Sequence, residues 1–398
     1  MSWPPGGQET GGPLAGVRVL ELARIIAGPL AGLYLADLGA DVLKIERPGG
    51  DEMRRYGPEK WDGVGSTFLA VNRNKRSLVL DLNDEGERRR LVDLVADSDV
   101  LIESYRPGVM AKWGLTFERL REVNPRLVLC SITGFGSVGP AASLGANNLI
   151  AEAFGGSLSV SKDPDDRMLT GAPMTDFFTG TSAALAIVSR LLVPREQRTA
   201  THIETSLLES QAMMMSGYIV GHLATGVDPD RAVGLPFTVP NQAFSASDGR
   251  LVLACNSEDM WRRMCAAIGR EDWLRRPEYA TNALRMQRQE EIVAALDEIL
   301  ATQTRDHWLR LFEQARVTSG PVNSVADLLR HPQVDAMRLM LPLPGGEIPG
   351  LAAVRLPFTF DGQPAHRGPH RPPPALDDAA EQLRAAEGGP ADAALDGR

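Results

Sequence analysis

Two short apolar runs near the N-terminus, separated by a helix-like stretch, constrain the fold most strongly. The run VRVLEL spans residues 17–22, a helical pattern follows Gly28 and Pro29 and continues to Leu38, and the run DVLKIE begins at Asp41. Parallel neighbouring strands need a crossover connection, and that connection is usually a helix. The N-terminal part of the chain therefore predicts a parallel βαβ unit.

The same alternation continues along the chain. Further strands are predicted at SLVLDL from Ser77, DVLIES from Asp99 and RLVLCSI from Arg126, with a charged helix from Asp84. Helical patterns then follow, with one more strand, THIETS, among them; the helical ranges are 148–154, 177–192 and 206–222. Regular alternation of this kind indicates an α/β fold, with a Rossmann-like large domain around a parallel sheet.

A chain of 398 residues exceeds the usual span of one compact core, so we expect two domains. The turn-rich segment GVDPDRAVGLPFTVPNQ opens a smaller α+β domain, and VNSVADLLRHPQV resembles a connector back to the large one. The expected parts are a disordered leader (1–13), the large α/β domain (14–225), the small α+β domain (226–324), the C-terminal return to the large domain (325–387) and a mobile tail (388–398).

Composition and charge exclude several classes of protein. The chain has 42 Lys and Arg against 51 Asp and Glu, and this net charge of -9 argues against a nucleic-acid partner. Cys130, Cys255 and Cys265 lack the spacing of a zinc or redox site, so we expect core residues in a reducing compartment. Neither a signal-peptide pattern nor an apolar run of about 18 residues occurs. We therefore expect a cytoplasmic protein with no membrane partner.

Three common site types are also disfavoured. The turn after Leu22 reads ARIIAGP and lacks the glycine fingerprint of a dinucleotide site, and Glu46 is followed by Arg47, which suits a phosphate better than a ribose hydroxyl. No pair of the six histidines has ligand spacing on a helix, and no G-x-S-x-G nucleophile motif occurs. We expect no NAD and no metal.

Basic residues gather where strands are predicted to end. Arginine and lysine side chains beside exposed backbone amides can bind phosphate groups, although solvated charge explains any single residue equally well. A phosphorylated cofactor therefore fits this pattern. The residues concerned are Arg47, then Arg73, Lys75 and Arg76 in NRNKRS, and Arg106 and Lys112 in YRPGVMAKWG.

Asp176 stands directly before an apolar helix, in the segment TGAPMTDFFTG. An acidic residue at this place is usually a helix N-cap. A carboxylate that a helix N-terminus keeps ionised and exposed would also suit a nucleophile. The pattern alone leaves both interpretations open.

Taken together, these segments resemble the class III CoA-transferases, the group that contains formyl-CoA transferase and carnitine CoA-transferase and is related to the alpha-methylacyl-CoA racemases. The resemblance covers roughly residues 14–358, and several blocks in one order are more specific than any one of them. The blocks are VRVLELARIIAGPLAGLYLADLGADVLKIERPGGDE, NRNKRSLVLDL, SDVLIESYRPGVMAKWGLTFERL, NPRLVLCSITGFGSVGP and GAPMTDFFTG.

The resemblance implies an activity and a site. It implies transfer of coenzyme A from an acyl-CoA to a small free carboxylic acid through a covalent intermediate on Asp176, first a mixed anhydride and then an aspartyl-CoA thioester. It also implies an interlocked homodimer. The CoA-binding positions that it implies are Ile25, Ile26, Ala27, Arg47, Leu80 to Asn83, Ser104, Tyr105, Arg106 and Lys112.

The chain departs from the family pattern at three places. Asn147 and Asn148 replace a Tyr-Asp or His-Asp pair; an amide exchanges no proton at neutral pH, so two-base racemisation is disfavoured. No glycine-rich loop is evident at 236–244, which disfavours oxalate and formate, and the C-terminal signature is altered to PPALDDAAEQL. We expect the acyl pocket around residues 56–61, the Asn147-Asn148 pair and residues 236–241.

Two alternatives to CoA transfer stay open. One is an acyl-CoA racemase or isomerase on the same fold, and the other is a catalytically idle acyl-CoA-binding dimer. Retention of Asp176 in its motif favours the transferase. The acids themselves do not follow from the sequence.

Overall fold

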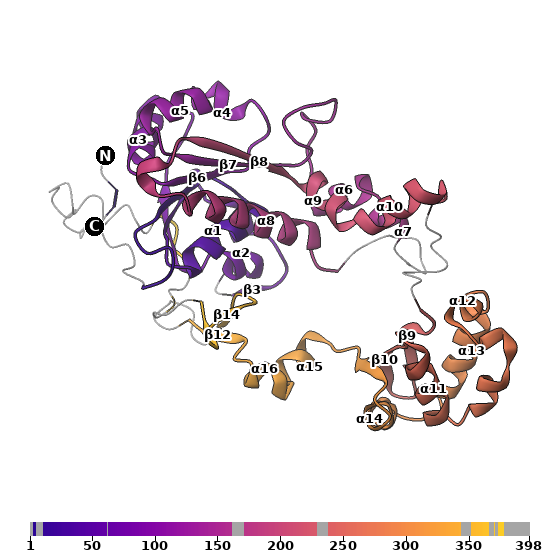
Figure 1. Cartoon of the computed structure of the whole chain (residues 1–398). Coiled ribbons are helices and arrows are strands. Elements are labelled where there is room, and N and C mark those ends of the chain that lie inside the picture. The colour runs from indigo at the N-terminus through magenta and orange to yellow at the C-terminus, as the bar shows by residue number, and fades with distance from the viewer. Residues whose placement is uncertain are drawn as a thin grey trace. The chain divides into compact units, whose positions relative to one another are not determined.

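The computed structural model describes residues 3–4, 11–61, 63–160, 171–228, 238–343, 352–365, 370 and 373–377. These residues form two compact units (Figure 1). The larger contains the described residues up to 159, those of 171–227 and those from 338 onward, and the smaller consists mainly of residues 238–337. The predicted tail and most of the predicted leader lie outside the described residues. Trp3 is buried, and its indole donates a hydrogen bond to Asp41 at 2.6 Å.

The larger unit is built on a parallel sheet. Within the described residues this sheet has six strands in the order β5-β2-β1-β6-β7-β8, and each neighbouring pair is parallel. The predicted Rossmann-like α/β fold is confirmed. The strands are β1 (Arg18–Glu21), β2 (Asp41–Glu46), β5 (Lys75–Val79), β6 (Val100–Glu103), β7 (Val128–Thr133) and β8 (Thr201–Ser206).

Helices cover both faces of this sheet, which explains why the central strands are continuous apolar runs. Helices α1 (Ala27–Asp37) and α8 (Met174–Leu191) pack on one face in a core that includes Val19 and Val128. Helices α3 (Glu85–Ala96) and α5 (Phe117–Val123) pack on the other, against Leu20 and Leu129. Figure 1 shows α3 and α5 on the opposite side of the strands from α1 and α8.

Shorter elements complete the larger unit. The helices are η1 (Glu52–Arg54), α2 (Ser66–Val71), α4 (Val109–Lys112), α6 (Asn148–Phe154), α7 (Ser157–Val160), η2 (Arg195–Gln197), α9 (Leu207–Met214) and α10 (Ser216–Thr225). The strand pairs are β3 (Lys60–Trp61) with β4 (Val64–Gly65), β12 (Met340–Pro342) with β13 (Ala352–Val354), and β14 (Thr359–Phe360) with β15 (Gln363–Pro364).

Several predicted elements differ from the structure, and helix α8 begins at Met174 rather than at residue 177. Strand β5 begins at Lys75 rather than Ser77, because Lys75 and Arg76 are buried in ion pairs that an apolar pattern does not reveal. The helix predicted over 206–222 is interrupted at Met215 and forms α9 and α10.

The smaller unit has the predicted α+β character. Its antiparallel sheet, within residues 238–337, has the strand order β11-β10-β9, and Trp261 stacks on Trp273 in the core beside it. Residues 229–237 of the predicted turn-rich segment lie outside the described residues. The elements are β9 (Asn241–Ala246), β10 (Gly249–Ala254), α11 (Glu258–Ala267), η3 (Glu271–Arg275), η4 (Pro277–Tyr279), α12 (Asn282–Met286), α13 (Gln289–Leu300), α14 (Arg305–Gln314), β11 (Thr318–Pro321), α15 (Val325–Arg330) and α16 (Pro332–Ala336).

Membrane-spanning helices and metal-binding clusters are absent from the described residues. These residues contain no helix that is both long and apolar enough to cross a bilayer. They also contain no group of three His, Cys, Asp or Glu side chains that could hold a metal ion. Cys130, Cys255 and Cys265 are free and buried, as the sequence predicts.

Candidate active site

The order in which the chain adds strands to the sheet reverses between the two central strands, β1 and β6. From β1 the chain passes to β2 and β5 on one side, whereas β6, β7 and β8 lie on the other side. Open α/β sheets bind ligands beyond the carboxyl ends of the strands at such a switch point. Arg24 follows β1 and Ser104 follows β6, and the Arg24 backbone N–H donates a hydrogen bond to Ser104 Oγ at 3.0 Å. The fold therefore places the predicted site residues of these two segments side by side.

A cavity of about 270 Å³ opens at this switch point, and we call it the Asp176 cavity. Ile25, which lines it, has φ of +72°, a conformation that is unfavourable for a β-branched residue and is typically kept at functional sites. The structure thus brings eight predicted site residues together. They are Ile25, Ile26, Ala27, Ser104, Tyr105, Arg106, Asn147 and Asp176.

A second cavity, of about 210 Å³, adjoins the first, and we call it the arginine cavity. Arg24 and Tyr105 line both cavities, so the two hollows lie next to each other. Buried Leu80 supplies apolar surface, while Arg47 and Asn83 supply exposed polar groups. This combination of apolar surface, amide and guanidinium groups suits a nucleotide.

Asp176 is not the N-cap of helix α8. The helix begins at Met174 after Pro173, and Asp176 lies in its first turn. Asn148, at the start of α6, supplies the cap from a distant part of the chain: its Oδ1 accepts hydrogen bonds from the backbone N–H groups of Thr175 at 2.9 Å and Asp176 at 3.3 Å. The interpretation of Asp176 as a cap is therefore wrong.

The Asp176 carboxylate is also less exposed than the sequence suggests. The residue is only 8% exposed, and burial, together with the nearby Glu152 carboxylate, raises the pKa of Asp176 to about 6. Glu152 lies in α6 and accepts a hydrogen bond from Asn148 Nδ2 at 2.9 Å. The expectation of an exposed Asp176 is wrong, and its pKa is raised because loss of hydration outweighs the helix N-terminus. Above pH 6 the site holds a weakly hydrated carboxylate.

Gly180 explains why the segment around Asp176 contains a glycine inside a helix. Helix α8 packs on the start of α1 so closely that a Cβ at Gly180 would overlap the Ala27 carbonyl oxygen. Only glycine permits this approach without a shift of backbone. The contact ties the Asp176 helix to the segment that lines the cavity.

Several predicted positions lie elsewhere. Lys112 is exposed on α4 and lines neither of the two cavities described above. Arg73, Lys75 and Arg76 are buried in structural ion pairs, so their interpretation as phosphate ligands is wrong. Of the expected acyl-pocket loops, residues 59–61 line a separate, mainly apolar cavity of about 540 Å³, and residues 236–237 lie outside the described residues.

Comparison with known protein families identifies the family of this chain. The model of CoA-transferase family III matches residues 14–379. The chain belongs to this family. Its resemblance to the class III CoA-transferases is thereby confirmed, and the protein is a transferase enzyme that uses CoA thioesters.

Curated relatives of this family III CoA-transferase cover nearly its whole length. It is 35% identical to a succinate–glutarate CoA-transferase of Agrobacterium fabrum, over 94% of this chain and 95% of the relative. It is 33% identical to an acetyl-CoA:oxalate CoA-transferase of Acetobacter aceti, with the same coverage. Among solved structures, a CAIB/BAIF family protein from Brucella suis is similar with a TM-score of 0.83 and 33% identity, over 94% of this chain and 99% of that one.

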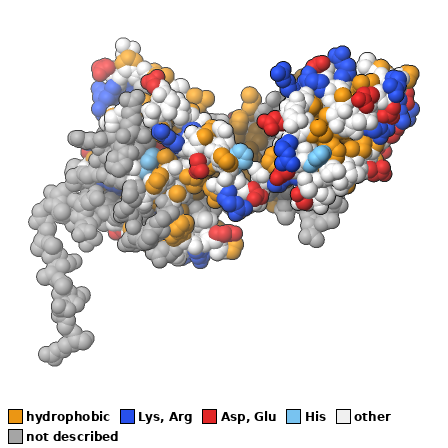
Figure 2. Space-filling model, turned by 90° about the horizontal axis from the view of Figure 1, so that it is seen from below, with side chains coloured by type: hydrophobic (Ala, Val, Ile, Leu, Met, Phe, Trp, Pro, Cys, Tyr) orange, Lys and Arg blue, Asp and Glu red, His pale blue; other side chains and the backbone are white. Residues whose placement is uncertain are grey.

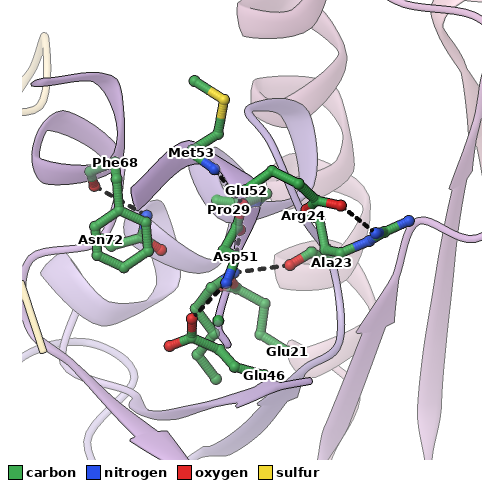
Figure 3. Close-up of polar contacts among 12 residues, drawn as sticks. Glu21, Ala23, Arg24, Pro29, Glu46, Asp51, Glu52, Met53, Phe68 and Asn72 are labelled. Carbon is green, nitrogen blue, oxygen red and sulfur yellow. Dashed lines mark hydrogen bonds and ion pairs between the residues drawn. The ribbon is translucent and has the colours of Figure 1, made fainter. Parts of the chain in front are cut away.

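A buried ionic network underlies the site of this CoA-transferase. Lys44 Nζ pairs with Glu21 at 3.0 Å and Asp51 at 3.1 Å, and it donates a hydrogen bond to the Ala23 carbonyl at 2.8 Å. Figure 3 shows Glu21, Ala23 and Asp51 close together. Burial alone would lower the pKa of Lys44, but the neighbouring carboxylates of Glu21, Asp51 and Glu46 raise it above its ordinary value. The network therefore holds the end of β1, directly before Arg24.

Lys75 completes this network from strand β5. Its Nζ pairs with Glu21 Oε2 at 2.7 Å, and it donates hydrogen bonds to the Pro29 carbonyl at 2.7 Å and to Asn72 Oδ1 at 2.9 Å. Burial lowers the pKa of Lys75 to about 8. Because Pro29 lies in the first turn of α1, Lys75 and Lys44 hold both ends of the segment that lines the Asp176 cavity.

Sequence reasoning missed three residues of this CoA-transferase site. Arg24 lines both cavities, Glu52 pairs with Arg24 at 2.8 Å, and Glu152 lies close enough to raise the pKa of Asp176. Arg24 carried a signal, since it is a basic residue at a strand end, like Arg47. The other two carried none, because their neighbours come from distant parts of the sequence.

Proposed function

We propose that this CoA-transferase moves coenzyme A from an acyl-CoA to a free carboxylic acid, with Asp176 as the covalent carrier. The observation that carries the proposal is the buried Asp176 carboxylate in a cavity that adjoins a second cavity lined by arginine. A weakly hydrated carboxylate attacks more readily than one in bulk water. Its pKa of about 6 leaves it largely ionised at neutral pH.

The proposed reaction has four acyl exchanges. The Asp176 carboxylate attacks the thioester carbonyl, the carbon–sulfur bond breaks, and the CoA thiolate leaves a mixed anhydride. The thiolate then attacks the Asp176 carbonyl, releases the donor acid and forms an aspartyl-CoA thioester. The acceptor carboxylate attacks this thioester, which releases the CoA thiolate and forms a second mixed anhydride between Asp176 and the acceptor. The thiolate finally attacks the acceptor's carbonyl in this anhydride, forms the new acyl-CoA and frees the Asp176 carboxylate. One thioester replaces another overall, so the net reaction needs little driving force.

The proposed CoA site spans both cavities. Ile26, Ala27 and Leu80 offer buried apolar surface for the pantetheine arm and the adenine ring. Arg47 and Arg106 add positive charge where strands β2 and β6 end. A role for Lys112 in phosphate binding stays a prediction.

We propose dicarboxylic acids as the substrate class. The names of the two curated relatives given above point to succinate, glutarate and oxalate, all of which are dicarboxylates. Other relatives are named for mesaconate and malate. Oxalate, which the sequence disfavours, is an informative member of a test panel.

Racemisation or isomerisation is the alternative reaction on this fold. Asn147 lines the Asp176 cavity, and its side chain accepts a hydrogen bond from the Ile150 backbone N–H at 3.0 Å. An amide in this place does not act as an acid or a base. The cavity therefore supports acyl transfer better than proton transfer.

Trapping of the intermediate tests the function. Incubation with succinyl-CoA, followed by hydroxylamine, should convert Asp176 to a hydroxamate that mass spectrometry locates, and labelled succinate should exchange into succinyl-CoA. The Asp176→Ala variant should show neither result. Exchange that survives in this variant would disprove the mechanism. Loss of an α-proton to deuterated solvent without an acceptor acid would instead indicate a racemase, and CoA binding without turnover on a panel of acids would indicate an idle binder.

We further propose that two copies of the chain form an interlocked homodimer. Large hydrophobic side chains are exposed on α8 and α10, including Leu185 at 71% and Leu223 at 78%, and Figure 2 shows hydrophobic side chains at the surface among charged ones. Sedimentation equilibrium should give twice the mass of one chain, and a Leu185→Glu/Leu223→Glu variant should shift toward the monomer. A monomeric native protein at micromolar concentration would contradict this proposal.

We also propose a cytoplasmic location. The three cysteines are free and buried, which suits a reducing compartment. Cell fractionation that places the protein outside the cytoplasm would contradict this proposal.

A further inference from the structure

Three charged residues at the arginine cavity share one contact. Glu52 Oε1 pairs with Arg24 Nη1 at 2.8 Å and with Arg47 Nη2 at 2.8 Å. Figure 3 shows the contact between Arg24 and Glu52. The second oxygen, Glu52 Oε2, is buried and has no hydrogen-bond partner within the described part of the chain. One carboxylate oxygen thus occupies a position between two guanidinium groups, which is where an anionic ligand would bind.

Arg24 and Arg47 differ from the structural arginines of the same unit. Their side chains are 35% and 50% exposed, whereas the Arg73 side chain is 1% exposed and paired with Asp37. Exposed ion pairs contribute little to stability and exchange readily with other partners. Both arginines are therefore available to a ligand that displaces Glu52.

Arg24 lies at the junction of the two cavities. It lines both of them, and its guanidinium carbon lies 5.5 Å from the centre of the Tyr105 ring, which also lines both. Coenzyme A has its adenosine at one end, its thiol at the other, and a diphosphate followed by pantetheine between them. With the thiol near Asp176 and the adenosine in the arginine cavity, the diphosphate falls at this junction.

We propose that Arg24 acts together with Arg47 to bind the diphosphate of CoA, and that Glu52 is an internal counterion that holds this position until CoA displaces it. The inference rests on the proposed CoA-dependent function and adds two residues to it. A diphosphate carries two negative charges and several acceptor oxygens, and it therefore competes well with a single carboxylate for two guanidinium groups. Once displaced, the Glu52 carboxylate lies close to the diphosphate and weakens its binding.

Calorimetric titration with CoA, 3′-dephospho-CoA and pantetheine tests the assignment. Arg24→Gln should weaken binding of CoA and of 3′-dephospho-CoA by the same factor, about 10- to 100-fold, because a charge-assisted hydrogen bond is lost. Binding of pantetheine should not change. Glu52→Gln should strengthen CoA binding about 3- to 10-fold, because the competing charge is removed.

Matched variants separate this role from a structural one. Arg121→Gln removes an exposed arginine of α5 and should leave CoA affinity unchanged. Arg24→Lys keeps the charge without the forked donors, and it should recover part of the affinity. The dependence of CoA affinity on salt should be weaker in Arg24→Gln than in the native protein.

Three results would overturn the inference. If Arg24→Gln binds CoA with the affinity of the native protein, Arg24 does not contribute to the CoA site. A loss for CoA that is absent for 3′-dephospho-CoA would place Arg24 at the 3′-phosphate instead. Weaker CoA binding by Glu52→Gln would mean that Glu52 orients the arginines and does not compete. Failure of the native protein to bind CoA at all would instead contradict the proposed function.

Discussion

Asp176→Asn should abolish CoA transfer and, at neutral pH, stabilise the folded protein. Transfer should fall by about a thousandfold or more, because an amide cannot form the anhydride or the thioester. The gain in stability should be about 2–3 kcal/mol, because burial and Glu152 raise the pKa of Asp176 from 3.8 to about 6 in the folded state. A functional carboxylate here is kept at the expense of stability.

The sign of the pH dependence follows from that pKa. The folded protein binds the Asp176 proton more tightly than the unfolded chain, so the stability due to this group is fully present below about pH 4. It is lost as pH rises through about 6. The two proteins should therefore have similar stability at pH 4, and the variant should become the more stable one as pH increases to 7.

Urea unfolding at a series of pH values, together with isotope exchange between succinate and succinyl-CoA, measures both effects. Asp306→Asn is a matched control, since Asp306 is exposed in the first turn of α14. It should change stability by less than about 0.5 kcal/mol and leave transfer intact. A destabilised Asp176→Asn protein at pH 7 would show that the buried, ionised carboxylate is not unfavourable.

Lys75→Met should destabilise the larger unit by about 1–3 kcal/mol, because buried acceptor atoms lose their hydrogen-bond donor, while Glu21 keeps Lys44 as a charged partner. The substitution leaves Glu21 Oε2, the Pro29 carbonyl and Asn72 Oδ1 without the ammonium group that now contacts all three. Glu21 is wholly buried, so water cannot replace the lost partner.

An exposed ion pair provides the control for this second prediction. Arg89 and Glu85 pair on the surface of α3 with side chains 71% and 74% exposed, and Arg89→Met should cost less than about 1 kcal/mol. The double variant Lys75→Met/Glu21→Gln should recover part of the stability lost in Lys75→Met. Urea midpoints measure all three. A loss in Lys75→Met no larger than that in Arg89→Met would show that the network contributes nothing to the fold.

Apolar patterns predicted most of the large unit. The strand over 41–46, the strand over 201–206 and the helix over 148–154 have the predicted bounds, because each is a short run of suitable periodicity between clear turns. The predicted locations of charged side chains were less reliable than those of the apolar strands and helices. Lys75 and Arg76 were expected at a surface and are buried, because their partners lie on other strands.

The sequence by itself determined the α/β class, the family and the candidate nucleophile Asp176, since these depend on local patterns and on motifs in order. Only the tertiary structure decided how Asp176 is held and what surrounds the arginine cavity. Asn148 caps its helix from α6, Glu152 raises its pKa, and Arg24 meets Glu52 across the β1 and β2 segments. The physical reason is that burial and pairwise charge interactions depend on distances in space, which the order of strands in the sheet sets.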